Sequence, residues 1–122
     1  CFKGRVHFQI SPCINDELDK LSAIDEKSEL LANILKVIDK AIHTNYKIYP
    51  GNYIAYDILD GQKRFADRYT NKDQTTFANY LNSQLAKIPD VTSKDKDFLK
   101  ERILSMYANP LKNQLIALGQ EA

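Results

Sequence analysis

The first residues of the chain alternate between apolar and polar side chains. The odd-numbered residues from Lys3 to Ser11 are polar. A period of two residues is typical of a strand with one buried and one solvated face. The pattern predicts a β-strand within residues 1–14, whose backbone N–H and C=O groups need a neighbouring strand. Its apolar face consists of Phe2, Val6, Phe8 and Ile10.

The spacing of apolar residues changes to three and four farther along the chain. We interpret the polar residues 13–27 as a loop with one short helical turn. A helix is then predicted over residues 27–46, with Asp25 as its N-cap. The apolar stripe of this helix consists of Leu30, Leu31, Ile34, Leu35, Ile38, Ala41 and Ile42.

Proline and glycine mark the next two helices. Pro50 precedes a helix predicted over residues 51–59, and Gly61 ends that helix. A third helix is predicted over residues 74–88, with Asp73 as its N-cap.

Two more helices are predicted toward the C-terminus. The first covers residues 94–108 and is capped by Thr92 or Ser93. Pro110 ends it, because the residue before a proline avoids the helical region, and a last helix over residues 110–118 follows.

Together these elements predict a mainly α-helical fold. We expect four to five helices in a small bundle-like array, with one N-terminal β-strand left over from a larger mixed sheet. The chain begins with Cys1, and its only methionine is Met106. These two features favour a piece of a longer protein, since a lone strand is what remains when a sheet is divided.

Composition and charge exclude several classes of partner. With 43% apolar residues, 27% charged residues and a net charge of +1, the chain is an ordinary globular sequence without the strong field that would favour nucleic acid. The longest nearly apolar run, residues 30–38, is too short to span a bilayer. Cys1 and Cys13 flank the predicted strand, and an extended segment holds them too far apart for a disulfide.

Four tyrosines recur at steps of three and four residues. A continuous stripe of this kind suits an interface or a lipid headgroup layer. We favour the simpler interpretation, in which these rings pack the helix over residues 51–59 onto the helix over residues 27–46. The four residues are Tyr46, Tyr49, Tyr53 and Tyr56.

A basic segment follows the second helix. Lys63, Arg64 and Arg68 are candidates for binding a substrate phosphate, because guanidinium groups hold phosphate bidentately. Nearby carboxylates favour a structural salt-bridge network over a phosphate site. These carboxylates belong to Asp60, Asp67 and Asp73.

The two histidines do not form a catalytic motif. His7 lies on the polar face of the predicted strand, and His43 follows Asp39 by four residues, which favours an ordinary helix ion pair. No serine or cysteine has a nucleophile motif, and no spacing of ligating residues indicates a metal. We therefore expect no catalytic residue, no metal and no cofactor in this chain.

One resemblance gives these patterns a context. Residues 4–14, GRVHFQISPCI, resemble the strand that closes the catalytic domain of glycerolipid acyltransferases of the lysophosphatidate acyltransferase type. Ser11 stands where glycine is common, and Pro12 comes one step early. The segments NYKIYPGNYIAYDILDGQKRFADRYT and MYANPLKNQL are similar to the C-terminal extension of acyltransferases from Bacteroidetes-type bacteria.

The resemblance implies a non-catalytic region of a phospholipid-biosynthesis enzyme. Residues 1–14 would be the last strand of an upstream catalytic domain, and residues 15–122 a C-terminal helical domain. The parent would transfer an acyl group from acyl-CoA or acyl-carrier protein to a lysolipid hydroxyl, peripherally at the cytoplasmic face of the cell membrane. The family's H-x-x-x-x-D motif is absent here, because Pro12 and Ile48 stand where the aspartate would follow each histidine. The isolated chain is therefore expected to be inactive.

A second interpretation stays open. The chain would be a non-catalytic helical interaction module whose strand adds to the sheet edge of another protein. In either case an exposed strand with an apolar face favours pairing of two copies into a homodimer.

Overall fold

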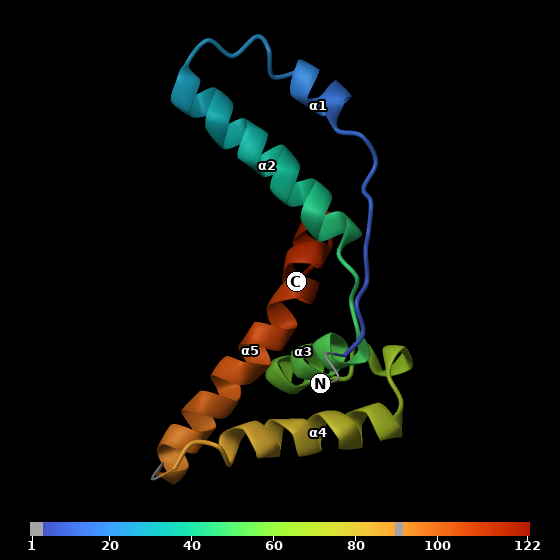
Figure 1. The fold of residues 1–122 in the computed structure, drawn as a ribbon, viewed down its shortest axis with the longest axis vertical. Helices are drawn as coiled ribbons and strands as arrows, with labels where there is room; N and C mark the ends of the chain where they lie inside the picture. The colour runs from blue at the N-terminus through green and yellow to red at the C-terminus, as the bar shows by residue number, and fades with distance from the viewer. Residues whose placement is uncertain (1–3, 90–91) are drawn as a thin grey trace. The chain divides into compact units, whose positions relative to one another are not determined.

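The computed structural model describes residues 4–89 and 92–122, and it is mainly helical (Figure 1). The described chain forms two compact units. One unit is the chain up to Lys47 together with Asn113–Ala122, and the other is Ile48–Lys112. The helices are α1 (Asn15–Asp19), α2 (Lys27–Asn45), α3 (Pro50–Asp60), α4 (Asn71–Leu85) and α5 (Ser93–Ala117), with a 3-10 turn at Ala66–Arg68.

The predicted N-terminal strand is not formed. The structure describes residues 4–14 as extended coil, and it contains no strand within residues 4–89 and 92–122. The physical reason is the lack of a partner, since a strand needs a neighbouring ladder for its backbone groups. Phe8 and Ile10 are 89% and 91% exposed, so the apolar face of this segment is solvated. Phe2 and Lys3 lie outside the described residues.

Helix α2 begins at Lys27, as the sequence predicts, but with a different N-cap. The carboxylate of Glu26, rather than that of Asp25, accepts the backbone N–H of Glu29 at 2.6 Å. The pKa of Glu26 is lowered, chiefly by the hydroxyl of Ser28 and then by the backbone N–H groups of the first turn. Glutamate takes this position because its longer side chain still reaches the free N–H groups.

The C-terminal end of α2 is held by one amide. The Nε2 group of Gln114 donates to the carbonyl oxygens of His43, Thr44 and Tyr46 at 3.2, 3.3 and 2.8 Å. These carbonyls have no partner within the helix, so a side-chain donor from elsewhere satisfies them.

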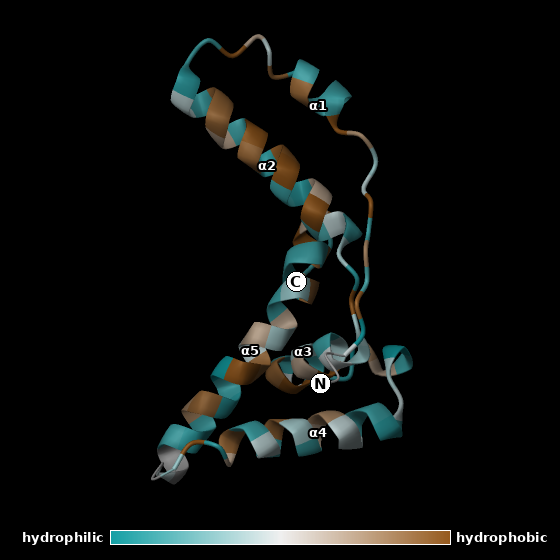
Figure 2. Ribbon diagram, viewed as in Figure 1, coloured by the Kyte–Doolittle hydropathy of each residue, from teal (hydrophilic) through white to brown (hydrophobic). Residues whose placement is uncertain are grey.

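The apolar stripe of α2 is present but exposed. No residue of α2 is buried, and apolar residues recur along the helix in Figure 2. A stripe of this kind normally faces a core or a partner. Its exposed members are Leu31, Leu35, Ile38 and Ile42.

Helix α3 begins and ends within one residue of the predicted range. Pro50 occupies its first turn, and Gly61 follows its last residue with a φ of +69°, which favours glycine. At Gly51 the helix approaches α4 closely, because a Cβ atom there would lie 3.3 Å from the ring of Phe77. This close approach allows α3 and α4 to pack together.

A buried amide connects α3 to α5. The Oδ1 atom of Asn52 accepts the N–H of Tyr49 at 2.8 Å, and its Nδ2 group donates to the carbonyl of Tyr107 at 2.8 Å. A buried amide with both ends satisfied fixes the register of two helices. Around it lies the core of the unit Ile48–Lys112. The buried apolar residues are Ile54, Ala55, Tyr56, Phe77, Leu81, Leu104, Ala108 and Leu111.

Helix α4 begins three residues before the predicted start. Its N-cap is Thr70, whose hydroxyl accepts the N–H of Asp73 at 3.1 Å, while the carboxylate of Asp73 accepts the N–H of Thr70 at 2.8 Å. The predicted cap Asp73 is thus the second member of a capping box. The N–H and hydroxyl of Thr70 lower the pKa of the Asp73 carboxyl.

The two predicted C-terminal helices form one. Helix α5 starts at Ser93 and is capped by Thr92, one of the two predicted caps, because the Thr92 hydroxyl accepts the N–H of Asp95 at 3.3 Å. The helix then continues through Pro110. Proline removes the N–H that would bind the carbonyl four residues earlier. Burial of Ala108 and Leu111 on either side of Pro110 outweighs this loss.

Candidate ligand-binding site

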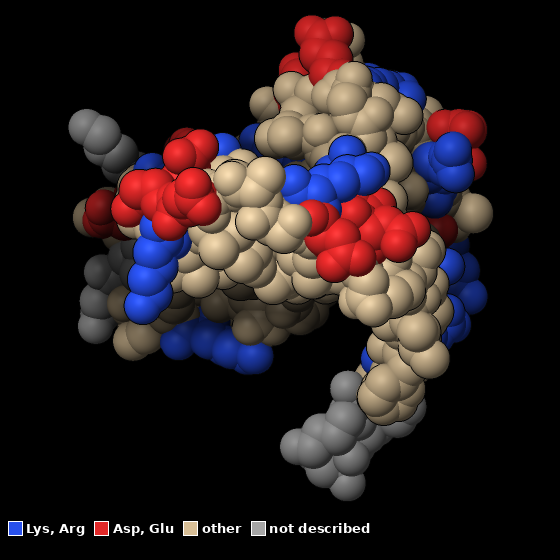
Figure 3. Space-filling view, turned by 90° about the horizontal axis from the view of Figure 1, so that it is seen from above, with Lys and Arg blue, Asp and Glu red and all other residues tan. Residues whose placement is uncertain are grey.

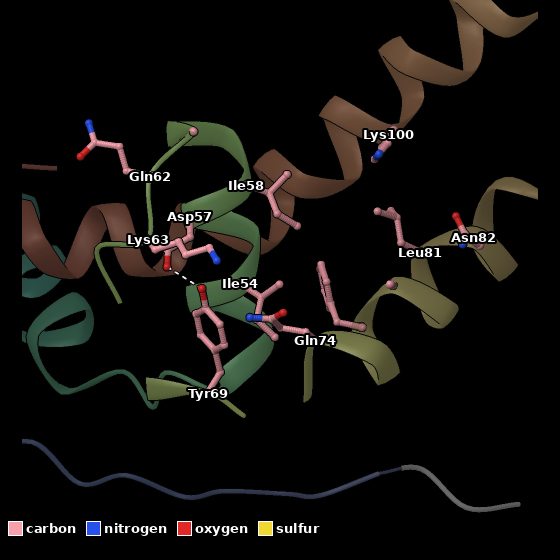
Figure 4. A pocket seen from close by; sticks show the side chains of 13 residues that line it. Ile54, Asp57, Ile58, Gln62, Lys63, Tyr69, Gln74, Leu81, Asn82 and Lys100 are labelled. Atoms are coloured by element: carbon pink, nitrogen blue, oxygen red, sulfur yellow. Dashed lines mark hydrogen bonds between the residues drawn. The ribbon is translucent and has the colours of Figure 1, made fainter. Parts of the chain in front are cut away.

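A cavity of about 530 Å³ opens within the unit Ile48–Lys112 (Figure 4). It lies among α3, the connection over residues 61–70, α4 and α5. This volume is in the range of about 300–1,000 Å³ that small-molecule sites occupy. The apolar residues that line it are Ile54, Ile58, Phe77, Ala78 and Leu81, and the main polar ones are Asp57, Lys63, Tyr69, Gln74, Asn82 and Lys100.

A buried carboxylate anchors the connection that forms one wall. Asp57 is 5% exposed and accepts the backbone N–H of Phe65 at 3.2 and 3.1 Å. Its Oδ2 atom also accepts the hydroxyl of Tyr69 at 2.7 Å, the bond drawn in Figure 4. Two donors that lie eight and twelve residues after Asp57 are thereby tied to one turn of α3. This arrangement satisfies a buried charge without a cation.

The hydroxyl of Tyr69 is held neutral by its surroundings. Burial raises the pKa of Tyr69, and the hydrogen bond to Asp57 and the charge of Asp57 raise it further. The side chain of Gln74 has the opposite effect and lowers the pKa of Tyr69. Tyr69 therefore stays protonated at neutral pH, and its hydroxyl donates a hydrogen bond to Asp57.

The structure separates the three predicted phosphate ligands. Lys63 lines the cavity. Arg64 instead lies over the ring of Phe65, with 5.1 Å from Cζ to the ring centroid, and donates to the hydroxyl of Tyr56 at 3.3 Å. Arg68 contacts Asp67 at 3.6 Å, and both side chains are exposed. Of the three residues, Lys63 is the one that lines this cavity.

Two of the four tyrosines singled out from the sequence pack within the unit Ile48–Lys112. Tyr53 and Tyr56 stack against Phe65, with ring centroids 5.3 and 5.4 Å apart. Tyr49 precedes α3, and Tyr46 is exposed beyond the end of α2. The two helical tyrosines therefore hold the connection over residues 61–70 against α3.

A second aromatic group joins α4 to α5. The hydroxyl of Tyr107 donates to that of Tyr80 at 2.8 Å, and the ring of Phe77 meets the ring of Tyr107 edge-on at 5.4 Å. Burial, together with the hydrogen bond to Tyr80 and the charge of Tyr80, raises the pKa of Tyr107 to about 12.

This raised pKa predicts loss of stability in alkali. An acid with a higher pKa in the folded state than in the unfolded state stabilises the fold while it is protonated. The contribution of Tyr107 is complete below its ordinary pKa of 10.0 and is lost as the pH rises toward about 12. We expect Tyr107→Phe to lose less stability than the unmodified chain between about pH 9 and about pH 11. Urea midpoints measured at both pH values test this, and parallel losses in the two proteins would contradict it.

The histidines lie apart from the cavity. His7 is exposed and hydrogen-bonds Gln9 at 3.2 Å. His43 and Asp39 line a separate hollow of about 530 Å³ between α2 and the end of α5, and no ion pair joins them in the described structure. Within residues 4–89 and 92–122, no group of three histidine, cysteine or acidic side chains is placed to hold a metal.

Surface charges are mixed in sign. Figure 3 shows basic and acidic side chains interspersed on the face in view, consistent with a net charge of +1. In the described part of the chain, no helix has both the length and the apolarity to cross a bilayer. Comparison with protein-family models, curated proteins and solved structures found no match to this chain.

Proposed function

We propose that this chain is the non-catalytic C-terminal region of a lipid acyltransferase that acylates a lysophospholipid or a related lipid hydroxyl. The segment over residues 4–14 would add to the catalytic sheet of the parent enzyme, which would use acyl-CoA or acyl-carrier protein as donor. The parent would work peripherally at the inner face of the cell membrane. The helical units would support the sheet and shape a lipid-binding pocket.

One observation carries this proposal. Residues 4–11 alternate between the two faces of a strand, yet Val6, Phe8 and Ile10 are exposed and the backbone of the segment over residues 4–14 lies in no ladder among the described residues. Solvated apolar side chains at that spacing fit a strand whose partner lies elsewhere. The sequence resemblance of the same segment supports a catalytic sheet as the partner.

The test compares two faces of this segment in the full gene product. Ile10→Ser should lower the melting temperature of the full product, because Ile10 would pack beneath the sheet. The same change in the 122-residue chain should have no effect, since Ile10 is 91% exposed there. Gln9→Ser, on the opposite face, is the matched control and should be neutral in both proteins. Equal melting temperatures for both variants of the full product would overturn the proposal.

Activity provides a second measurement. The full product should transfer acyl groups, the isolated chain should not, and His43→Ala should leave the rate of the full product unchanged. Acyl transfer by the 122-residue chain that His43→Ala abolishes would contradict a non-catalytic role.

The same exposed segment favours one other candidate. A helical interaction module would pair residues 4–14 with the sheet edge of a separate protein or of a second copy. In that case the full product would lack acyl transfer. Ile10→Ser would weaken complex formation and would leave the melting temperature of the full product unchanged.

A further inference from the structure

The cavity within Ile48–Lys112 has two chemically different parts. Its floor is apolar, and Ile58 remains 49% exposed although it is a large aliphatic residue. Figure 4 shows Ile54, Ile58 and Leu81 in the middle of the site. An apolar surface left open in a cavity of this size is suited to an apolar ligand.

Polar groups gather on one side of this floor. Figure 4 shows one polar group made of Lys63, Tyr69 and Gln74. Lys100, which belongs to α5, lies on the other side of the floor. Both lysines are exposed, and neither forms an ion pair among the described residues. An unpaired ammonium group beside an apolar floor is complementary to an acidic group that carries an apolar tail.

The buried carboxylate of Asp57 does not reverse the preference of the cavity for an acidic head group. Asp57 already accepts the N–H of Phe65 and the hydroxyl of Tyr69, and it is 5% exposed. The cavity lining therefore carries two exposed positive side chains and one buried carboxylate, and the oxygens of that carboxylate already accept hydrogen bonds from Phe65 and Tyr69.

We propose that this cavity binds a single-chain amphiphile with an acidic head, the head at Lys63 beside Gln74 and the tail along Ile54, Ile58 and Leu81. Carboxylate and phosphate heads share the required chemistry. The site lies wholly within one unit and does not depend on the acyltransferase proposal. The two proposals can therefore be tested separately. The chain can fail to bind the amphiphile although the parent is an acyltransferase, and it can bind the amphiphile although the parent is not an acyltransferase.

Calorimetric titration of the 122-residue chain with four premicellar ligands tests the ligand class. Laurate and dodecyl phosphate should bind, and the tighter of the two identifies the head. Dodecanol and dodecyltrimethylammonium should bind more weakly. Added salt should lower the affinity for laurate and dodecyl phosphate, because salt screens exposed charges. Equal binding of dodecanol and laurate, or tighter binding of the cation, would overturn the proposal.

Charge variants test the position of the head. Lys63→Ala should weaken laurate binding about threefold, and Lys100→Ala should weaken it less. The double variant Lys63→Glu/Lys100→Glu should weaken it more than either single change. Lys96→Ala is the matched control, since Lys96 is an exposed lysine on α5 outside the cavity lining, and it should have no effect. An unchanged affinity in the double glutamate variant would contradict the assignment.

A filled cavity tests the position of the tail. Ala78→Leu should weaken laurate binding at least about tenfold, because the larger side chain occupies the floor. Thr76→Leu adds a similar side chain to α4 outside the cavity lining and should leave binding unchanged. Circular dichroism verifies that both variants fold. Unchanged laurate binding by folded Ala78→Leu would place the ligand outside this cavity. Loss of laurate binding in Thr76→Leu but not in Ala78→Leu would lead to the same conclusion.

Discussion

Replacing Phe77 by alanine is expected to lower the free energy of unfolding by about 4 kcal/mol. Phe77 is 7% exposed, its ring meets that of Tyr107 edge-on at 5.4 Å, and it packs against the backbone at Gly51. Alanine removes the buried ring and leaves a space that two helices cannot close without separating from each other. Urea unfolding followed by circular dichroism measures the loss.

Phe98 provides the matched control. Its ring is 54% exposed on α5, with the guanidinium carbon of Arg102 4.8 Å from the ring centroid. Phe98→Ala should cost less than about 1 kcal/mol, since a surface cation–π contact contributes little. Equal losses for Phe77→Ala and Phe98→Ala would contradict the packing of α3, α4 and α5 described above.

Replacing Asp57 by alanine is expected to cost about 3 kcal/mol of stability. The change leaves the backbone N–H of Phe65 and the hydroxyl of Tyr69 without their acceptor. The connection over residues 61–70 should then detach from α3, because these two bonds hold it there. Faster amide exchange at Phe65 would accompany the loss.

Two variants separate the hydrogen bonds of Asp57 from its charge. Asp57→Asn keeps one acceptor oxygen and should lose less stability than Asp57→Ala. Asp60→Ala removes an exposed carboxylate one turn later and should change stability by less than about 0.5 kcal/mol. A neutral Asp57→Ala would show that the connection is held by its aromatic contacts alone.

The elements with strong local signals could be predicted from the sequence. Helices α2 and α3 lie within one or two residues of the expected ranges. A long apolar stripe defines the first, and Pro50 and Gly61 define the limits of the second. These signals are local, so tertiary contacts were not needed to find them.

The errors concern features that distant residues decide. Pro110 predicts a helix end locally, yet burial of Ala108 and Leu111 keeps α5 continuous. The N-terminal alternation predicts a strand, but strand formation depends on a partner that the described chain does not contain. In both cases long-range packing or pairing outweighs local propensity.

The candidate site could be predicted only in part. Lys63 was singled out, but it was grouped with Arg64 and Arg68 because the three are close in sequence. Their environments differ, since Arg64 stacks on Phe65 and Arg68 contacts Asp67. Asp57 was missed, although a lone acidic residue inside the apolar stretch YIAYDIL is a signal for a buried, satisfied carboxylate.

The most direct test of the proposed function is to read the coding sequence upstream of Cys1. The proposal predicts two family motifs within the length of one domain before the segment over residues 4–14. The first is the catalytic H-x-x-x-x-D motif, and the second is E-G-x-R, which binds the acceptor phosphate in that family. If the upstream sequence lacks H-x-x-x-x-D, the acyltransferase proposal is contradicted and the interaction module replaces it.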